Sequence, residues 1–450
     1  MPRTARKPNV VVFFTDQQRW DTTGIHGNPM GLTPNFDRMA LEGTHFYHAY
    51  TCQPVCLPAR AALQTGMYST QVRCHTNGCS LPTDARTLAH CFNDAGYHTG
   101  YIGKWHLCKE LVVPKRLRGG YREWLGANVL EHCSDAYNCV MYDGASKEVK
   151  LPGYRVDAQA DAAIRFIDRN QARPFFLFLS FLEPHFQNHR DDYPAPDVYA
   201  DKYLDPWTPP DLRALGGSSA RHLPGYYGMV KRLDDALGRV RDALKSLGLS
   251  RNTIVLFTAD HGCHFKTRNG EYKRSCHDGS IRVPAAAVGP GFMAGGRVQQ
   301  MFSLVDVAPT LLDACGIRVP KHMVGRSIMP VVNHRSAVWP GEVFVQISES
   351  QVGRAVRTHR WKYCVTAPDK HPNLDAGSGT YREEALYDLY ADPYELNNLA
   401  GFTSHRLVAD VMKKRLLRCM ARAAEPRPKI VNAPEVRSGQ KRLLPGEECE

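Results

Sequence analysis

Short runs of consecutive apolar residues alternate along the chain with longer segments whose apolar residues recur at helical spacing. Three of the short runs are rich in β-branched and aromatic side chains, which is typical of strands buried on both faces of a sheet: Val10–Phe14, Pro174–Phe181 and Thr253–Thr258. Val156–Asn170 and Tyr226–Leu247 have the apolar spacing of amphipathic helices. The alternation predicts an α/β fold in which helices sandwich a large mixed, mostly parallel sheet.

The pattern changes near Asn333. Three short strands separated by turns are predicted there: Val343–Ile347, Ala355–Thr358 and Trp361–Val365. Leu407–Ala421 has the pattern of a helix. We therefore expect two domains, a main domain of residues 1–335 and a smaller C-terminal α+β subdomain of residues 336–450 with a short antiparallel sheet and a helix.

Polar residues follow directly after several predicted strands. The residues at these strand ends are Asp16 and Gln17, Lys104 and His106, His185, and Asp260 and His261. Because ligands bind outside the carboxyl ends of the strands in open α/β sheets, we expect these side chains to lie along one edge. Taken singly, each residue is also explained by a helix cap, a surface lysine or a satisfied core histidine.

The stretch Thr51–Gly66 predicts a loop that enters a helix, because Pro58 is near a first helical position and Gly66 is a typical helix stop. Cys56 would then lie at the helix N-terminus, where free amide hydrogens favour an anion and lower the pKa of a thiol. Arg60, one turn later, would add a fixed cation. A buried cysteine beside a capped helix explains the same local pattern.

The segment Cys56-Leu57-Pro58-Ala59-Arg60, with Leu63, Thr65 and Gly66 after it, resembles the signature of the type I sulfatases of the alkaline phosphatase superfamily. In that family the cysteine of C-x-P-x-R is oxidised to Cα-formylglycine by a maturation enzyme. The resemblance extends from Val10 to about Ala400.

Two further segments carry the same resemblance. Gly103-Lys104-Trp105-His106-Leu107 is similar to the family's G-K-W-H-L, and Gly270–Pro284 is similar to K-x-x-x-x-E-G-G-x-R-V-P. In the second segment Asp278 and Ser280 replace the more usual Glu and second Gly, so details of the pocket are not carried over.

The resemblance implies one divalent cation, with the ligands Asp16, Gln17, Cys56, Asp260 and His261. The commonest family pair at the first position is Asp-Asp, whereas this chain has Gln17 as its second member. Mostly oxygen ligation favours Ca²⁺, while the amide and the imidazole leave Mn²⁺, Mg²⁺ and Zn²⁺ open.

The resemblance also implies a mechanism. Hydrated formylglycine at position 56 would attack sulfur, with Arg60 and the metal lowering the pKa of the attacking hydroxyl and Lys104 fixing it. Lys273 and His185 would bind the sulfate oxygens and assist departure of the alcohol. His106 would then take the proton of the second hydroxyl, so that sulfate leaves. His264 and His277 are candidates for additional contact with the substrate.

Composition changes this picture little. Among 450 residues, 43% are hydrophobic and 23% charged, which is ordinary for a globular protein, and the formal net charge of +12 gives weak support for an anionic ligand. No nucleic-acid-binding motif is present. No signal peptide or membrane-spanning run is recognised, so we expect a cytoplasmic protein without a membrane partner. The cysteines are scattered, with Cys74 and Cys79 or Cys133 and Cys139 close enough in sequence to form bridges.

We therefore expect a sulfatase that cleaves a sulfate monoester, with a sulfated carbohydrate favoured as the substrate. The nearest alternative is a phosphonate monoester or phosphodiester hydrolase of the same superfamily, because the transition states share charge and geometry. A non-catalytic carbohydrate-binding homologue and a redox or zinc protein are alternatives of other classes. The sugar, the metal, the modification state of Cys56 and the oligomeric state are not decided by the sequence.

Overall fold

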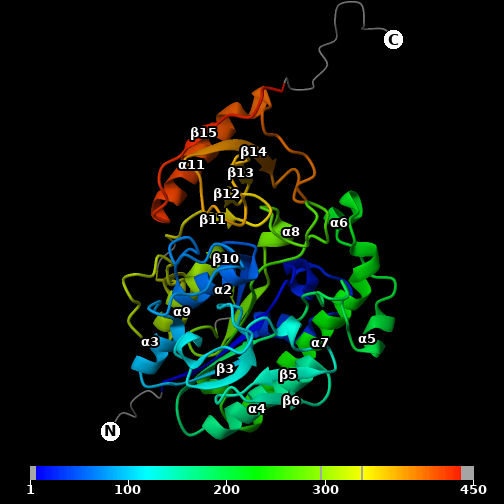
Figure 1. Cartoon of the computed structure of the whole chain (residues 1–450), viewed down its shortest axis with the longest axis vertical. Coiled ribbons are helices and arrows are strands. Elements are labelled where there is room, and N and C mark those ends of the chain that lie inside the picture. The colour runs from blue at the N-terminus through cyan, green and yellow to red at the C-terminus, as the bar shows by residue number, and fades with distance from the viewer. Residues whose placement is uncertain (1–6, 294–295, 336–337, 437–450) are drawn as a thin grey trace, which may run out of the picture.

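A ten-stranded sheet forms the centre of the computed structural model, which describes residues 7–293, 296–335 and 338–436 (Figure 1). The strand order is β10-β2-β9-β8-β1-β7-β3-β4-β5-β6. The strands are β1 (Asn9–Thr15), β2 (Thr44–Tyr50), β3 (His98–Lys104), β4 (Glu123–Ala127), β5 (Cys139–Tyr142), β6 (Glu148–Leu151), β7 (Phe175–Ser180), β8 (Thr253–Ala259), β9 (Ala285–Val288) and β10 (Gly296–Ser303).

The central strands of this sheet are parallel and fully buried. β1 pairs in parallel with β7 on one side and β8 on the other, and β3 pairs in parallel with β7 and β4. Antiparallel pairings occur toward both edges, where β9 lies between β8 and β2 and where β5 joins β4 to β6. The carboxyl ends of β1, β3, β7 and β8 therefore meet at one edge, as the predicted α/β fold requires.

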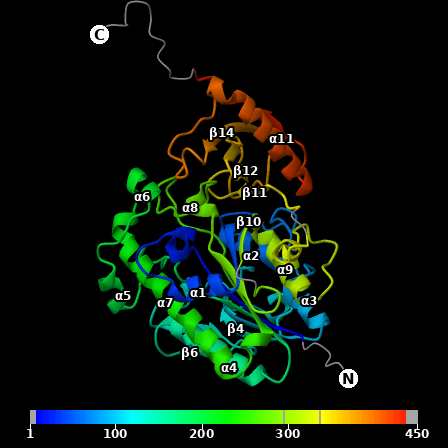
Figure 2. The ribbon, with the colours of Figure 1, turned by 180° about the vertical axis from the view of Figure 1, so that it is seen from behind.

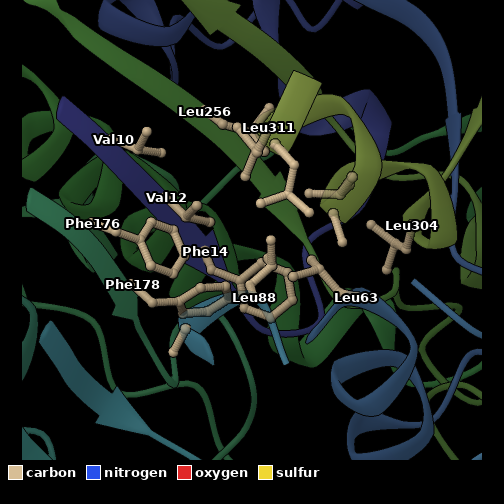
Figure 3. Packing of buried hydrophobic residues seen from close by; sticks show 14 of the residues in the cluster. Val10, Val12, Phe14, Leu63, Leu88, Phe176, Phe178, Leu256, Leu304 and Leu311 are labelled. Atoms are coloured by element: carbon tan, nitrogen blue, oxygen red, sulfur yellow. The ribbon is translucent and has the colours of Figure 1, made fainter. Parts of the chain in front are cut away.

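Alternating side chains of β1 supply two hydrophobic cores. Val10, Val12 and Phe14 pack on one face with residues of helices α2, α3 and α9, such as Leu63 and Leu311 (Figure 3). Val11 and Phe13 pack on the opposite face with residues of α1, α4 and α7. Both faces are covered by helices, which explains why the strand sequences are continuously apolar.

The helices of the main sheet vary widely in length. They are α1 (Pro34–Glu42), α2 (Cys56–Thr65), α3 (Leu88–Asp94), α4 (Arg155–Asn170), α5 (Asp197–Lys202), α6 (Pro210–Leu215), α7 (Ser219–Ser246), α8 (Asp278–Ile281), α9 (Val307–Ala314) and α10 (Met329–Val332).

A second sheet lies at one end of the molecule, where the C-terminal segments are drawn in orange and red (Figures 1 and 2). Its strands are β11 (Glu342–Ile347), β12 (Gly353–Thr358), β13 (Trp361–Thr366), β14 (Thr380–Asp388) and β15 (Lys429–Val431). The first four are antiparallel neighbours, and helix α11 (Arg406–Arg422) packs on one face. The other face packs against Tyr50, Ile281 and Met301 of the main unit.

The predicted fold class is confirmed, but three local expectations are wrong. The sequence of Leu111–Leu151 has no clear period and predicts an insertion or loop region, yet it contains β4, β5 and β6, which are too short to give such a period. Asp191–Pro210 is rich in Pro, Asp and Tyr and predicts an irregular loop, yet it contains α5. Helix α7 begins at Ser219, before the periodic stretch Tyr226–Leu247, with Pro224 inside it. The predicted boundary between residues 335 and 336 lies beside undescribed residues, so the two-domain division stays a prediction.

The cysteine pairs suggested by the sequence are not bridged. Every cysteine in the described ranges is a free thiol, including Cys74, Cys79, Cys133 and Cys139.

A buried ion network fastens the second sheet to the main unit. Lys362 of β13 is fully buried and contacts Asp278 at 2.6 Å, and it also pairs with Glu395. Arg357 of β12 lies 3.0 Å from the other oxygen of Asp278. Because Asp278 begins α8, the network holds the segment that carries Lys273.

We expect the substitution Lys362→Met to lower the free energy of unfolding by about 3–5 kcal/mol, because it leaves Asp278 and Glu395 buried with less compensating charge. Urea unfolding followed by fluorescence measures the change. The control is Arg360→Met in the turn between β12 and β13, because the Arg360 side chain is 53% exposed beside Asp388 and its loss should leave the unfolding midpoint nearly unchanged. Equal midpoints for the two variants would contradict the importance of the buried network.

Candidate active site

Cys56 is the first residue of α2, and its side chain is buried at the N-terminal end of that helix. The preceding Val55 is extended, and the amide of Leu57 donates a hydrogen bond to Asn77 Oδ1 at 3.1 Å. The helix ends at Gly66, whose φ of 65° is favourable for glycine and lets its N–H bond the Ala62 carbonyl. The predicted loop-to-helix geometry is therefore present.

Two carboxylates meet beside this thiol because they end adjacent parallel strands. Asp16 follows β1 and Asp260 follows β8, and both side chains are fully buried. The backbone N–H groups of Gln17 and His261 donate hydrogen bonds to Asp260 Oδ1 at 3.0 and 2.9 Å. Gln17 has a φ of 63°, an uncommon conformation for a side chain of its size, which turns its amide toward Asp260.

Two cations from other elements offset these carboxylates. Arg60 of α2 lies 2.9 Å from Asp16 and 3.3 Å from Asp260. Lys104, at the end of β3, lies 2.8 Å from Asp16 Oδ2. The side chains of Arg60 and Lys104 are at most 3% exposed. These ion pairs are therefore buried, and solvent does not screen them.

Three further side chains complete the cluster: His261 and Lys273 contact the Cys56 sulfur, and His185 contacts Lys273. His261 Nε2 lies 3.3 Å and Lys273 Nζ lies 3.0 Å from Cys56 Sγ. Lys273 Nζ is also 3.1 Å from His185 Nε2, and His185 Nδ1 bonds the Phe186 carbonyl at 2.7 Å. The carbonyl accepts the Nδ1 proton, so Nε2 of a neutral His185 accepts a hydrogen bond from the Lys273 ammonium.

The charges shift the pKa values of the thiol and the carboxylates. Burial alone would raise the pKa of Cys56, yet the nearby Lys273, Lys104 and His261 hold it well below its usual value. Burial and the neighbouring Asp16 carboxylate raise the pKa of Asp260 to about 6. The pKa of Asp16 is lowered despite its burial, with Lys104 as the main favourable cation.

The donor atoms fit a divalent cation. Asp16, Cys56, Asp260 and His261 each offer a ligand atom, and these atoms lie within 4.8 Å of one another. His261 Nδ1 bonds the Gly262 carbonyl at 2.9 Å, which directs the Nε2 lone pair of a neutral ring at the two carboxylates. Asp260 Oδ2 accepts no hydrogen bond from any described residue. Converging acceptors of this kind repel one another unless a cation lies among them.

The side chains of three other predicted residues bond neighbours of this cluster. Gln17 directs its amide nitrogen at Tyr193 Oη, 3.1 Å away, and its oxygen lies 3.5 Å from Lys273 Nζ. His264 bonds the Lys273 carbonyl at 2.9 Å, and His277 bonds Ser275 and Tyr387. Both histidines are thus hydrogen-bonded to protein groups in or near the segment that carries Lys273. Contact with the substrate stays a prediction for each.

His106 follows Lys104 at the same edge and has a φ of 50°. A hydrogen bond with His106 contributes to the lowered pKa of Cys56. Its Nδ1 is buried and has no partner among the described residues.

Sequence reasoning missed several buried charges around the cluster. Glu131, in the short 3-10 helix Leu130–His132 after β4, lies 2.9 Å from Lys104 Nζ. Arg155 is fully buried and pairs with Glu183 at 2.8 Å, just before His185. The one sequence signal for Arg155 is a charged residue at the start of a mostly apolar helix face, and Glu131 has none.

Comparison with known proteins agrees with this geometry. The family model described as Sulfatase matches residues 8–317, and the model of the N-sulphoglucosamine sulphohydrolase C-terminal region matches residues 270–422. The chain belongs to the sulfatase family. It is therefore a hydrolase that acts on sulfuric ester bonds.

Individual relatives of this sulfatase are similar over at least three quarters of their length. The ulvan-active sulfatase of Formosa agariphila is 32% identical over 420 residues, which cover 88% of this chain and 77% of the relative. A solved structure in complex with its substrate D-glucosamine-2-N,6-O-disulfate has a TM-score of 0.78 at 23% identity, covering 94% of this chain and 99% of the other.

The fold extends to a neighbour of another named activity. The phosphonate monoester hydrolase of Agrobacterium radiobacter has a TM-score of 0.71 at 23% identity, covering 92% of this sulfatase and 96% of that chain. At this identity the likeness concerns the fold alone. In the described ranges, no helix combines the length and apolar character needed to span a membrane.

We expect Ca²⁺ at about 100 times its dissociation constant to raise the melting temperature of the chelator-treated sulfatase by about 3 °C, because it binds the folded state alone. The shift should shrink toward pH 5, since protons compete with the cation for Asp260, whose pKa is raised to about 6.

Asp260→Asn should abolish this shift. The control Asp135→Asn alters a partly exposed ion pair with Arg190 and should retain it. Equal calcium shifts in both variants, measured by scanning calorimetry, would place the cation elsewhere.

Proposed function

We propose that this sulfatase cleaves the sulfate monoester of a sulfated carbohydrate, with a formylglycine made from Cys56 and one divalent cation. The observation that carries the proposal is the convergence of Cys56 Sγ, two carboxylates and His261 within 4.8 Å, with Lys273 Nζ 3.0 Å from the sulfur. Buried charged groups cluster mainly at functional sites, so these surroundings of the thiol favour a chemical role for position 56.

Asp16, Asp260 and His261 would hold the cation, with Gln17 as a further candidate ligand. When bound, the cation supplies positive charge that stabilises the ester oxygens and lowers the pKa of a neighbouring hydroxyl. Ca²⁺ is favoured because carboxylate oxygens dominate the donor set. When formed, the aldehyde hydrate at position 56 supplies a nucleophilic hydroxyl in place of the thiol.

Lys273 and His185 would bind the ester and assist its departing oxygen. Their mutual distance of 3.1 Å lets the Lys273 ammonium donate to a neutral His185, whose pKa is lowered by burial and by Lys273. The pair therefore holds a proton beside the position of the sulfate group. Transfer of that proton to the leaving alcohol would avoid release of an alkoxide.

Lys104, Arg60 and His106 lie on the other sides of position 56. Lys104 and Arg60 are fixed by Asp16, so their positive charges are oriented before substrate arrives. His106 has a buried Nδ1 without a described partner and could accept a proton during release of sulfate. We assign His106 this role because it is among the groups that lower the pKa of the position 56 side chain.

A polar rim beside the nucleophile supports a saccharide as the substrate. Asn77 accepts from the Leu57 amide and donates to Glu349 at 3.2 Å, and Glu349 pairs with Arg274 at 2.8 Å. Such amide, carboxylate and guanidinium groups match sugar hydroxyls. The relatives named above, one ulvan-active and one with a disulfated glucosamine, support the same substrate class.

We expect peptide mass spectrometry to find formylglycine at position 56 when the protein is produced with a maturation enzyme. Cys56→Ala, or production without that enzyme, should lower turnover of a sulfated saccharide by more than about 10³-fold, because the nucleophile is lost. Cys315→Ala, which removes a thiol outside the cluster, is the control and should keep full activity. Undiminished turnover by Cys56→Ala would refute the proposal.

Lys273→Met should lower kcat/KM by about 10²–10³-fold while leaving conversion of Cys56 intact, because a charge that stabilises the transition state is lost. Lys266→Met, in the same loop but paired with Asp191 near the surface, is the matched control. Paired sulfate and phosphonate monoesters measure substrate preference in the same assay. A phosphonate preferred by more than tenfold would favour the alternative hydrolase.

A further inference from the structure

Glu131 is a buried carboxylate next to the candidate active site that the proposed mechanism does not use. It lies in a short 3-10 helix (Leu130–His132) just after β4, at the edge where the other site residues gather. Its side chain is 3% exposed, and its Oε1 lies 2.9 Å from Lys104 Nζ. The Lys104 ammonium also contacts Asp16 Oδ2 at 2.8 Å, so it bridges Glu131 and Asp16, one of the candidate metal ligands.

The charge of Glu131 is only partly offset. Lys104 is a single cation shared by two carboxylates, and Asp16 already takes part of its charge. The other oxygen of Glu131, Oε2, is buried and accepts no hydrogen bond from any described residue. Glu131 therefore presents a carboxylate oxygen without a donor beside the site, where burial prevents screening of its charge by salt.

The structure holds Glu131 firmly in this position. The Glu131 carbonyl accepts a hydrogen bond from Gln187 Nε2 at 2.9 Å. Arg155 contacts the Gln187 oxygen at 3.4 Å and pairs with Glu183 at 2.8 Å. A second buried pair, Arg155 with Glu183, thus fixes the backbone that presents Glu131.

We propose that Glu131 is a specificity-determining residue that favours singly charged esters over doubly charged ones. A sulfate monoester carries one negative charge, whereas a phosphate or phosphonate group with two ionised oxygens carries two near neutral pH. Repulsion from a fixed buried carboxylate grows in proportion to the ligand charge. Glu131 would thereby select sulfate esters in a site whose cations attract either kind of anion. The inference rests on the proposed function.

A purely structural role for Glu131 gives a different expectation. If Glu131 served only to orient Lys104, its loss would weaken a doubly charged ligand at least as much as a singly charged one, so the relative affinity for the doubly charged ligand would stay the same or fall. The ratio of the two affinities therefore separates the two roles, and the absolute activity does not.

The test compares two competitive inhibitors of the metal-loaded, matured enzyme at about pH 8.5, well above the second ionisation of a phosphoryl group. Phenylphosphonate is doubly charged there, and its monomethyl ester is singly charged with nearly the same shape. Glu131→Gln should improve the affinity for phenylphosphonate relative to the ester by about tenfold, as loss of one nearby buried charge requires. Titration calorimetry measures both dissociation constants, and an assay for released methanol checks that the ester stays intact during the titration.

Two variants serve as controls. Glu131→Asp keeps the charge and should keep the affinity ratio within about twofold. Glu183→Gln removes the buried carboxylate that pairs with Arg155 and should change both affinities by one factor, leaving the ratio unchanged. If Glu131→Gln does not fold, Glu131→Asn is compared with Glu131→Asp in the same way.

An unchanged ratio in Glu131→Gln, or equal changes in Glu131→Gln and Glu131→Asp, would overturn the inference. Failure of the proposed function has a different signature. In that case the wild-type enzyme would cleave no sulfate ester, while the affinity ratio measured by calorimetry would still depend on the charge of residue 131.

Discussion

The repulsion between two buried carboxylates is the constraint on which this site depends. Asp16 and Asp260 end adjacent parallel strands, so the sheet itself forces them together out of contact with water. Such an arrangement persists only where cations compensate it. Arg60 of α2 and Lys104 of β3 supply part of that compensation. A divalent cation held by the two carboxylates and His261 Nε2 would supply the rest.

The rest of the architecture brings compensating groups to this point. The edge where β1, β3, β7 and β8 end gathers residues that are far apart in the sequence, which is the usual placement of ligand sites in α/β sheets. The second sheet contributes indirectly. Its Lys362 and Arg357 form ion pairs with Asp278, which lies five residues after Lys273. The small sheet therefore stabilises the segment whose Lys273 ammonium contacts Cys56.

Much of this arrangement could be predicted from the sequence, because continuous apolar runs mark buried strands and polar residues after them mark strand ends. Asp16, Lys104, His185 and Asp260 were placed at one edge by that reasoning, and the motif around Cys56 gave the family. Glu131 could not be found in this way. It follows β4 in a region of short strands with no clear period, and its partner Lys104 is distant in sequence. Pairing of buried charges depends on tertiary geometry that local patterns do not encode.

The most direct test of the central claim is an experimental structure of the matured protein grown with Ca²⁺, with the cation located by anomalous scattering. The account predicts one cation bounded by Asp16, Asp260 and His261, within coordinating distance of the side chain at position 56. A cation bound elsewhere, or carboxylates at these positions that remain paired only with Arg60 and Lys104 at saturating Ca²⁺, would contradict it.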